Sequence, residues 1–275
     1  FKFKHKLLGH PALSIESLSK ALPEIPSHQV MYSKSLSDLG INFDRAHIEH
    51  KNGLTLTETI ENIRISNSYI AVKNPETHPS FHGLFNDLVE DVSQLMQVRG
   101  IGKRAMEPMF WMFIASPNAM TPFHFDRYSN FLMQFRGSKQ VAVFPPMKEE
   151  VISAEDCEAY IDRTEKRPPW DESKDQYATK FDFAPGEMIH IPFVSGHYVK
   201  NGPEDVSVSL SFFFHNDHTL RSTRALQVNH RIRKRMKKIG LTPTSVGANR
   251  GLDILKSQAL PLANFLGRTM GKLRS

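Results

Sequence analysis

The sequence predicts a mostly β fold in which short antiparallel strands form a sandwich or barrel and helices lie at its flanks. Two observations carry this prediction. From about residue 110, short apolar runs follow one another and are separated by turns that contain Gly or Pro. The last of them, VSVSLSFFFHN at 206–216, alternates with the period of two that is typical of a strand. After residue 220 the pattern becomes helical and basic.

The residues before the first apolar run are expected to combine helices with one strand. SIESLSKAL has helical spacing with Ser14 as its cap, and Glu16 falls one residue short of completing a capping box. A second helix is expected from Thr57, followed by a strand at 68–72. FHGLFNDLVEDVSQLM, at 81–96, places its apolar residues on one face of a helix.

The predicted strands begin with FWMFIAS at 110–116, an apolar run typical of a buried strand. NFLMQF and QVAVFP then flank RGSK, where Gly137 is expected to make the tight reversal of a hairpin. Residues 147–180 are polar and irregular and too long for an ordinary connection, so we expect a functional loop there. FDFAPGEMIHIPFVSGHYVKN, at 181–201, adds a strand, a Pro-Gly turn, a second strand and, after a short break, a third.

Charge divides the chain into an acidic body and a basic C-terminal region. The net charge is +6, yet residues 218–275 hold 13 Lys or Arg and one acid, which leaves 22 bases and 28 acids in residues 1–217. No apolar run approaches the roughly 20 residues that span a bilayer. The N-terminal residues lack the apolar stretch of a secretory signal. Because Cys157 is the only cysteine, no disulfide can form within the chain, and a cytoplasmic location is expected.

TPFHFD, at 121–126, contains two side chains that bind metals. Residues i and i+2 of a strand point to the same side, so His124 and Asp126 can reach one ion while Phe123 and Phe125 pack behind them. Pro122 is expected at the strand start, where its missing N–H does least harm. By itself, the triplet is equally consistent with a solvated surface pair.

A third ligand would turn this pair into a metal centre. Two histidines and one carboxylate leave three adjacent coordination positions open, an arrangement diagnostic of non-haem Fe(II) oxygenases. His197 is the preferred candidate. His190, inside a strand, and His215, at the end of one, are the alternatives, and they could instead be a core and a surface residue.

Two blocks of sequence, TPFHFDRYSNFLMQFRGSKQVAVFPP at 121–146 and PGEMIHIPFVSGHYVKN at 185–201, resemble the JmjC, or cupin-like, 2-oxoglutarate oxygenases. The pattern is closest to the asparaginyl hydroxylase that inhibits the hypoxia-inducible factor. The resemblance implies a double-stranded β-helix, a cupin or jelly-roll barrel with its core at about 105–216. It divides the chain into an oxygenase domain over 1–220 and a basic helical region over 221–275.

The resemblance also implies roles for individual residues. Those that match the iron ligands of the family are His124, Asp126 and His197. Those that match residues contacting 2-oxoglutarate are Thr121, Asn130 and Lys139. Lys139 would pair with the distal carboxylate of 2-oxoglutarate. Without the resemblance, its position beside a turn would instead suggest a solvent-exposed lysine. Ser211 stands where the hydroxylase has an asparagine, and its shorter side chain offers fewer hydrogen bonds.

The expected function is therefore that of an Fe(II)- and 2-oxoglutarate-dependent oxygenase. Hydroxylation of a protein side chain is the favoured reaction. Lysine demethylation and a small-molecule substrate are weaker alternatives. A non-catalytic metal-binding protein and a nucleic-acid-associated protein acting through the basic tail are the competing classes. The tail itself could pair with the acidic body, with a second copy through the apolar segment 252–267, with nucleic acid or with an anionic membrane.

Overall fold

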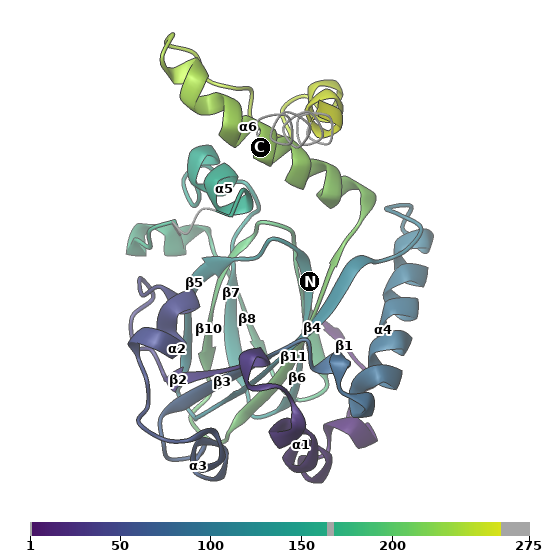
Figure 1. Cartoon of the computed structure of the whole chain (residues 1–275), viewed down its shortest axis with the longest axis vertical. Coiled ribbons are helices and arrows are strands. Elements are labelled where there is room, and N and C mark those ends of the chain that lie inside the picture. The colour runs from purple at the N-terminus through teal and green to yellow at the C-terminus, as the bar shows by residue number, and fades with distance from the viewer. Residues whose placement is uncertain (1, 164–167, 260–275) are drawn as a thin grey trace, which may run out of the picture.

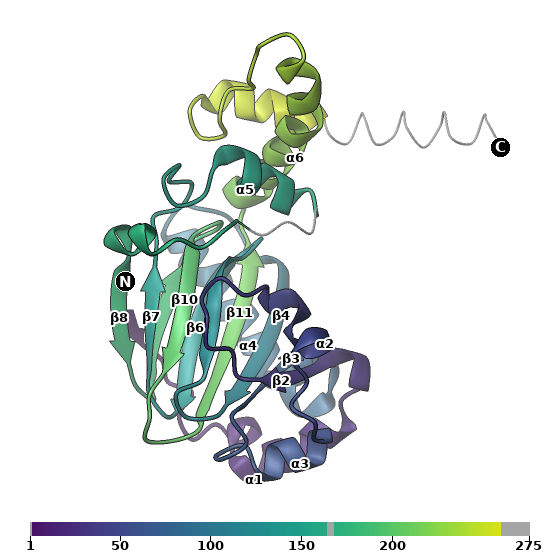
Figure 2. The same cartoon turned by 90° about the vertical axis from the view of Figure 1, so that its left-hand side faces the viewer.

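Two stacked antiparallel sheets form the body of the protein (Figures 1 and 2). The computed structural model describes residues 2–163 and 168–259. The larger sheet contains, in order, β1 (Lys2–Lys4), β9 (Glu187–Ile191), β6 (Ser129–Arg136), β11 (Ser207–His215), β4 (Met106–Ala115), β3 (Ser68–Lys73) and β2 (Val30–Lys34). The smaller sheet contains β5 (Met120–Phe125), β10 (Gly196–Asn201), β7 (Lys139–Val143) and β8 (Thr179–Phe183). This architecture confirms the predicted jelly-roll barrel with flanking helices.

Successive strands of the barrel cross from one sheet to the other. From β4 to β11 the chain alternates between the sheets, except that β7 pairs with β8 across the long excursion. The predicted hairpin at Gly137 is therefore wrong, because β6 does not pair with β7. The strands on either side of the Pro-Gly turn, β8 and β9, do not pair with each other either. Gly137, with φ of 66°, turns the chain from the larger sheet into the smaller one. A short turn between apolar runs is equally compatible with pairing and with crossing, so the pattern could not decide between them.

The N-terminal helices lie close to their predicted positions. α1 (Ile15–Ala21) is capped by Ser14, whose hydroxyl accepts from the Ser17 N–H. α2 (Ala46–Glu49) is a single turn. α3 (Leu56–Glu61) begins one residue before the prediction because Thr55 and Glu58 form a capping box that the sequence reading missed.

α4 (Pro79–Val98) covers the outer face of the larger sheet (Figure 1). Its apolar face is the one predicted from 81–96. Phe81 and Leu84 are fully buried there, in one cluster with Phe110 of β4 and Phe212 of β11. Packing of this kind, rather than helix propensity, supplies most of the stability of a helix in a protein.

Pro122 lies within β5, as its third residue, and not at the start of the strand. β5 is an edge strand of the smaller sheet, where a missing N–H leaves no sheet partner unsatisfied. Phe123 and Phe125 are buried, as predicted, in the cluster behind the strand. Asp126 follows one residue after the strand ends.

The expected excursion lies between β7 and β8, but it is not irregular throughout, because it contains a helix, α5 (Ala154–Ile161). α6 (Asp217–Lys237) packs against α5, and both lie beyond one end of the sheets (Figures 1 and 2). α6 starts before residue 220 because Asn216 and Thr219 form a capping box. Residues 250–259 form a further helical stretch, and the second half of the apolar segment expected to associate, 252–267, lies outside the described residues.

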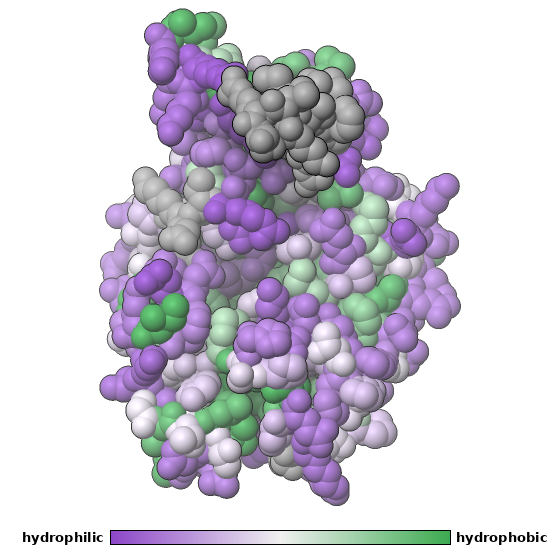
Figure 3. All heavy atoms as spheres, in the orientation of Figure 1, coloured by the Kyte–Doolittle hydropathy of each residue, from purple (hydrophilic) through white to green (hydrophobic). Residues whose placement is uncertain are grey.

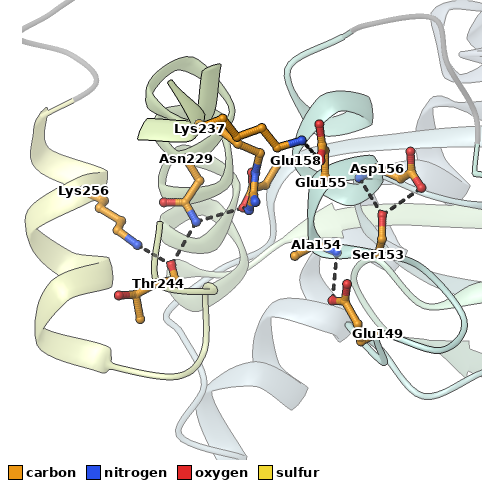
Figure 4. A network of polar contacts seen from close by, with 11 residues as sticks. Glu149, Ser153, Ala154, Glu155, Asp156, Glu158, Asn229, Lys237, Thr244 and Lys256 are labelled. Carbon is orange, nitrogen blue, oxygen red and sulfur yellow. Dashed lines mark hydrogen bonds and ion pairs between the residues drawn. The ribbon is translucent and has the colours of Figure 1, made fainter. Parts of the chain in front are cut away.

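Part of the basic region pairs with the acidic body of the same chain (Figure 4). Glu158 of α5 is fully buried and accepts two hydrogen bonds from the Arg233 guanidinium, at 2.6 and 2.7 Å. Asn229 donates to the same carboxylate at 3.0 Å, and Lys237 pairs with Glu155 at 2.6 Å. Around these contacts, the face seen in Figure 3 is mostly hydrophilic over α6.

The turn at Gly137 generates a prediction about stability. A Cβ at this position would lie 2.6 Å from the Val206 carbonyl oxygen, and the positive φ adds strain. We expect Gly137→Ala to lower the free energy of unfolding in urea by about 2–4 kcal/mol. Gly53→Ala is the control, because Gly53 has φ of 81° and no atom within 4 Å, so it should lose only about 1 kcal/mol. Equal losses for both variants would contradict the clash.

The buried ion pair generates a second prediction. Arg233→Ala leaves the Glu158 charge buried without its guanidinium, so we expect a loss of about 3–5 kcal/mol in urea unfolding. Replacing both residues by Met should cost less than Arg233→Ala alone, since no charge is then left buried. Lys237→Ala removes an exposed pair and should cost less than about 1 kcal/mol. An Arg233→Ala loss as small as that of Lys237→Ala would refute the role of the buried pair.

Candidate metal centre

Three side chains converge at one end of the smaller sheet. The antiparallel register of β5 and β10 places His124 directly opposite His197, with their ring centroids 4.1 Å apart. Asp126 completes the group, its Oδ2 lying 3.5 Å from His197 Nε2. One ligand atom from each residue lies within 4.8 Å of the others, a spacing at which a single metal ion fits between them.

Backbone carbonyls fix the tautomers of both histidines. His124 Nδ1 lies 2.7 Å from the Pro122 oxygen, and His197 Nδ1 lies 3.0 Å from the Ser195 oxygen. A carbonyl can only accept, so in each ring Nδ1 carries the proton and Nε2 keeps its lone pair. Outer hydrogen bonds of this kind orient metal-binding histidines and raise their basicity.

The two competing histidines do not join this group. His190 packs against Phe131, at 5.1 Å between ring centroids, and burial lowers its pKa to about 4. His215 lies over the Tyr128 ring and bonds through Nδ1 to Thr219 Oγ1 at 3.1 Å. Its pKa is also lowered to about 4 by burial. Both rings are therefore neutral and pack against aromatic side chains outside the cluster, with His190 half-buried and His215 buried. The surface position that was the alternative for His215 is wrong.

A cavity of about 280 Å³ lies next to these three side chains and extends into the barrel. Its lining includes every residue to which the oxygenase resemblance gives a role: Thr121, His124, Asp126, Asn130, Lys139, His197 and Ser211. The fold thus brings together all seven, from five strands and the residue after β5. Their roles toward a co-substrate stay predictions.

Lys139 is the buried cation of this cavity. Its side chain is buried, and its Nζ donates to Ser209 Oγ at 2.8 Å. Among the residues that the structure describes, no carboxylate pairs with it, and burial lowers its pKa to about 7. An ammonium group has three donors, so two remain for a ligand. The solvent-exposed position expected from its sequence context alone is therefore wrong, because Lys139 is buried.

Two amide oxygens in the cavity also lack partners. Asn130 Oδ1 and Asn201 Oδ1 are buried, and neither has a hydrogen-bond partner within the described chain. Asn201 stands opposite Lys139 in the pairing of β10 with β7. Buried polar atoms normally find partners, so these two orphaned oxygens indicate a site built for a polar ligand.

Sequence reasoning missed several residues of the cavity. Asn201 follows His197 by four positions, so the period of two in β10 was a signal that it shares the face of the ligand. Ser207, which also lines the cavity, precedes Ser211 by four positions in β11 and carries the same signal. Tyr69 lies far back in the chain and had no such signal, yet it hydrogen-bonds Thr121, and burial raises its pKa.

The far side of the cavity mouth is formed by α5. Tyr160 and Arg163 line it together with Arg127, whose guanidinium carbon lies 3.9 Å from the centre of the Tyr160 ring. No local pattern could have joined these residues, since about 33 positions separate Arg127 from Tyr160.

Comparison with known families agrees with this architecture. A family model described as "Cupin-like domain" matches residues 37–220, more than half of the chain. The chain belongs to the cupin-like domain family. The matched part contains the barrel strands β4 to β11 and the three clustered metal-ligand candidates.

Individual relatives are distant. The chain is 26% identical over 134 residues to "JmjC domain-containing protein F" of Dictyostelium discoideum, which covers 41% of this chain and 27% of that protein. The chain therefore spans about a quarter of the length of this curated relative. Among solved structures, oxalate decarboxylase of Bacillus subtilis is 17% identical with a TM-score of 0.28, covering 48% of this chain and 29% of that one. A recombinant oxalate oxidase in complex with glycolate is 13% identical with a TM-score of 0.27, covering 38% and 41%.

In residues 2–163 and 168–259, no helix has the length and apolar character that a membrane span requires.

The geometry predicts which histidine binds metal. His197→Ala should remove most of the bound divalent metal, because it deletes one of three ligands from a site in which both rings are already oriented. Metal content after loading would be measured by atomic emission on the purified full chain. His190→Ala is the matched control and should keep its metal, since that ring lies among aromatic side chains. Metal loss in the control with retention in His197→Ala would reverse the assignment.

Proposed function

We propose that this protein is an Fe(II)- and 2-oxoglutarate-dependent oxygenase that hydroxylates a protein side chain. One observation carries the proposal: a His, Asp, His cluster opens into a cavity whose inner wall holds a buried lysine, and no carboxylate of the described residues pairs with this lysine. The pattern of the sequence, closest to an asparaginyl hydroxylase, favours hydroxylation over demethylation.

The donor set fits an iron ion. Two neutral imidazoles and one carboxylate form the facial triad of the non-haem Fe(II) oxygenases, and His124, Asp126 and His197 would hold the metal. Bound iron with 2-oxoglutarate would supply oxidation of a C–H bond by dioxygen, coupled to decarboxylation of the co-substrate to succinate. The chain's own part is to keep three positions open, orient the ligands and exclude water from the cavity.

The cavity also fits a dicarboxylate. In the antiparallel pairing of β7 with β10, Lys139 lies opposite Asn201, and Val143 lies opposite His197. Lys139 is therefore four residues along β7 from the position that faces this metal-ligand candidate. This corresponds to about 13 Å along the strand, which a lysine side chain and a five-carbon dicarboxylate fill together. Lys139 would neutralise the distal carboxylate as a point charge.

Three further side chains would complete the co-substrate site. Thr121 and Asn130 line the same cavity as the metal-ligand candidates and the lysine, and each offers a polar group. Ser211 is too short to replace the asparagine of the hydroxylase fully. Asn201, on the neighbouring strand, presents a buried amide to the same cavity and would supply the missing hydrogen bonds.

The test is a turnover assay of the full chain with iron, ascorbate and 2-oxoglutarate. Peptide panels and cell extract would serve as prime substrates, with mass spectrometry to detect succinate and products heavier by one oxygen atom. Loss of a methyl group from lysine would indicate demethylation instead. Metal and 2-oxoglutarate binding without any succinate, across all substrates, would favour the non-catalytic metal-binding protein.

The lysine generates a prediction about pH. Without ligand, the Lys139 ammonium loses its proton above about pH 7, and a bound dicarboxylate restores it. Binding above pH 7 therefore takes up a proton, and the affinity for 2-oxoglutarate should fall by up to about tenfold per pH unit between pH 7 and 9. Titration calorimetry of the zinc-loaded chain, in two buffers of different ionisation enthalpy, measures both the affinity and the proton uptake.

The matched variants separate this effect from general changes. Lys139→Met should weaken binding at pH 6.5 and remove the proton uptake, while the metal content stays unchanged. Lys200→Met, an exposed lysine on the neighbouring strand, should bind like the wild type. An affinity of Lys139→Met equal to the wild type would return this lysine to a purely structural role.

A further inference from the structure

The mouth of the cavity carries an excess of positive charge. The described residues that line the whole cavity include four basic side chains and two carboxylates, namely Lys73, Arg127, Lys139, Arg163, Asp44 and Asp126. Asp126 belongs to the metal cluster, and Lys139 lies on the inner wall. Three bases and one acid therefore surround the opening through which a prime substrate would approach.

The Arg127 side chain and the Arg163 backbone are bonded to the same carbonyl oxygen. Arg127 Nε donates to the Tyr160 carbonyl oxygen at 2.9 Å, and the Arg163 N–H donates to that oxygen at 3.1 Å. The Arg127 guanidinium also lies over the Tyr160 ring, which restrains it further. Through its carbonyl oxygen, Tyr160 thus connects Arg127, which directly follows the metal-ligand candidate Asp126, to the end of α5.

Neither guanidinium is neutralised within the described part of the chain. Only Nε of Arg127 has an acceptor there, so its four other N–H groups are available. No carboxylate of the described residues forms an ion pair with Arg127 or Arg163. In contrast, Arg231 and Arg233 of α6, and Arg136 of β6, each have a carboxylate partner. One guanidinium held in place, with a second exposed one beside the same cavity and no acid paired with either among the described residues, is an arrangement suited to an anion.

The position of this pair is set by α5 and its anchor on α6. Glu158, two residues before Tyr160, is held by Arg233 and Asn229 (Figure 4). On the other side of the helix, the Tyr160 ring packs on Phe125 at 4.6 Å between centroids. Arg163 then turns away from the helix with φ of 64°. The C-terminal region thereby holds α5 where both arginines face the cavity.

We propose that Arg127 and Arg163 form a subsite that binds a carboxylate of the prime substrate. The substrate class is then a peptide segment with an acidic side chain beside the residue that is modified. This inference rests on the proposed function for its substrate, but the subsite itself is a binding site and requires no turnover. A carboxylate held by a planar guanidinium fork would align the segment over the metal.

The experiment measures peptide binding to the full chain loaded with zinc and 2-oxoglutarate. The probes are four pools of end-capped octapeptides with identical randomised positions and one fixed central residue, which is Asp, Asn, Lys or phosphoserine. We expect the Asp pool to be retained about tenfold more than the Asn pool at low salt, because one charge-assisted pair contributes a difference of that order. The preference should weaken as the salt concentration rises.

Charge reversal locates the preference. Arg163→Glu should abolish retention of the Asp pool and favour the Lys pool, with metal content and 2-oxoglutarate affinity unchanged. Arg235→Glu makes the same change in charge at an exposed position of α6 outside the cavity. This control should retain the four peptide pools in the same order of strength as the wild type. Because zinc supports no oxygenase turnover, a failure of the proposed reaction would leave this measurement unaffected.

Several results would overturn the subsite. Equal retention of the Asp and Asn pools, preference of the wild type for Lys, or no binding by any pool would each do so. Stronger retention of phosphoserine than of Asp would reassign the two arginines to phosphate. A loss of 2-oxoglutarate affinity in Arg163→Glu would place this residue in the co-substrate site instead.

Discussion

The pairing of β10 with its two neighbours is the constraint on which the site depends. On one side, its register with β5 sets His197 opposite His124, and on the other its register with β7 sets Asn201 opposite Lys139. One strand therefore fixes both ends of the cavity. Since side chains alternate along a strand, a slip of one residue would turn His197 and Asn201 away from the cavity together. Hydrogen bonds from Nδ1 of both histidines to backbone carbonyls then fix the orientation of each ring within this frame.

Two buried charges show different solutions to the cost of desolvation. Glu158 is satisfied inside the chain by Arg233 and Asn229, so it serves to hold helices together. Within the described residues, the Lys139 ammonium group has only the Ser209 hydroxyl as a partner, and burial lowers its pKa to about 7. A group left so poorly satisfied weakens the folded state, which is typical of positions kept for a ligand. The two unpartnered amide oxygens of the cavity fit the same interpretation.

The C-terminal region connects to the cavity through α5. Its basic composition suggested a tail for nucleic acid, but part of that charge is paired with Glu155, Glu158 and Asp162 of the same chain. Binding of nucleic acid by the remaining bases of α6 stays a prediction, and so does self-association through the C-terminal region. What the structure does describe is a helix that sets the position of Tyr160, and with it the two arginines at the mouth.

From the sequence alone, local spacing determined the strands, the amphipathic face of α4 and the shared face of His124 and Asp126. The resemblance to oxygenases added Lys139 and the third ligand, His197. Only the tertiary structure decided that Gly137 carries the chain between sheets, that Asn201 faces Lys139, and that Tyr160 lies beside Arg127. The physical reason is one of range. Alternation and capping report the burial and hydrogen bonding of a few neighbouring residues. Strand partners and helix docking depend instead on packing between segments that are tens of residues apart, which no local pattern encodes.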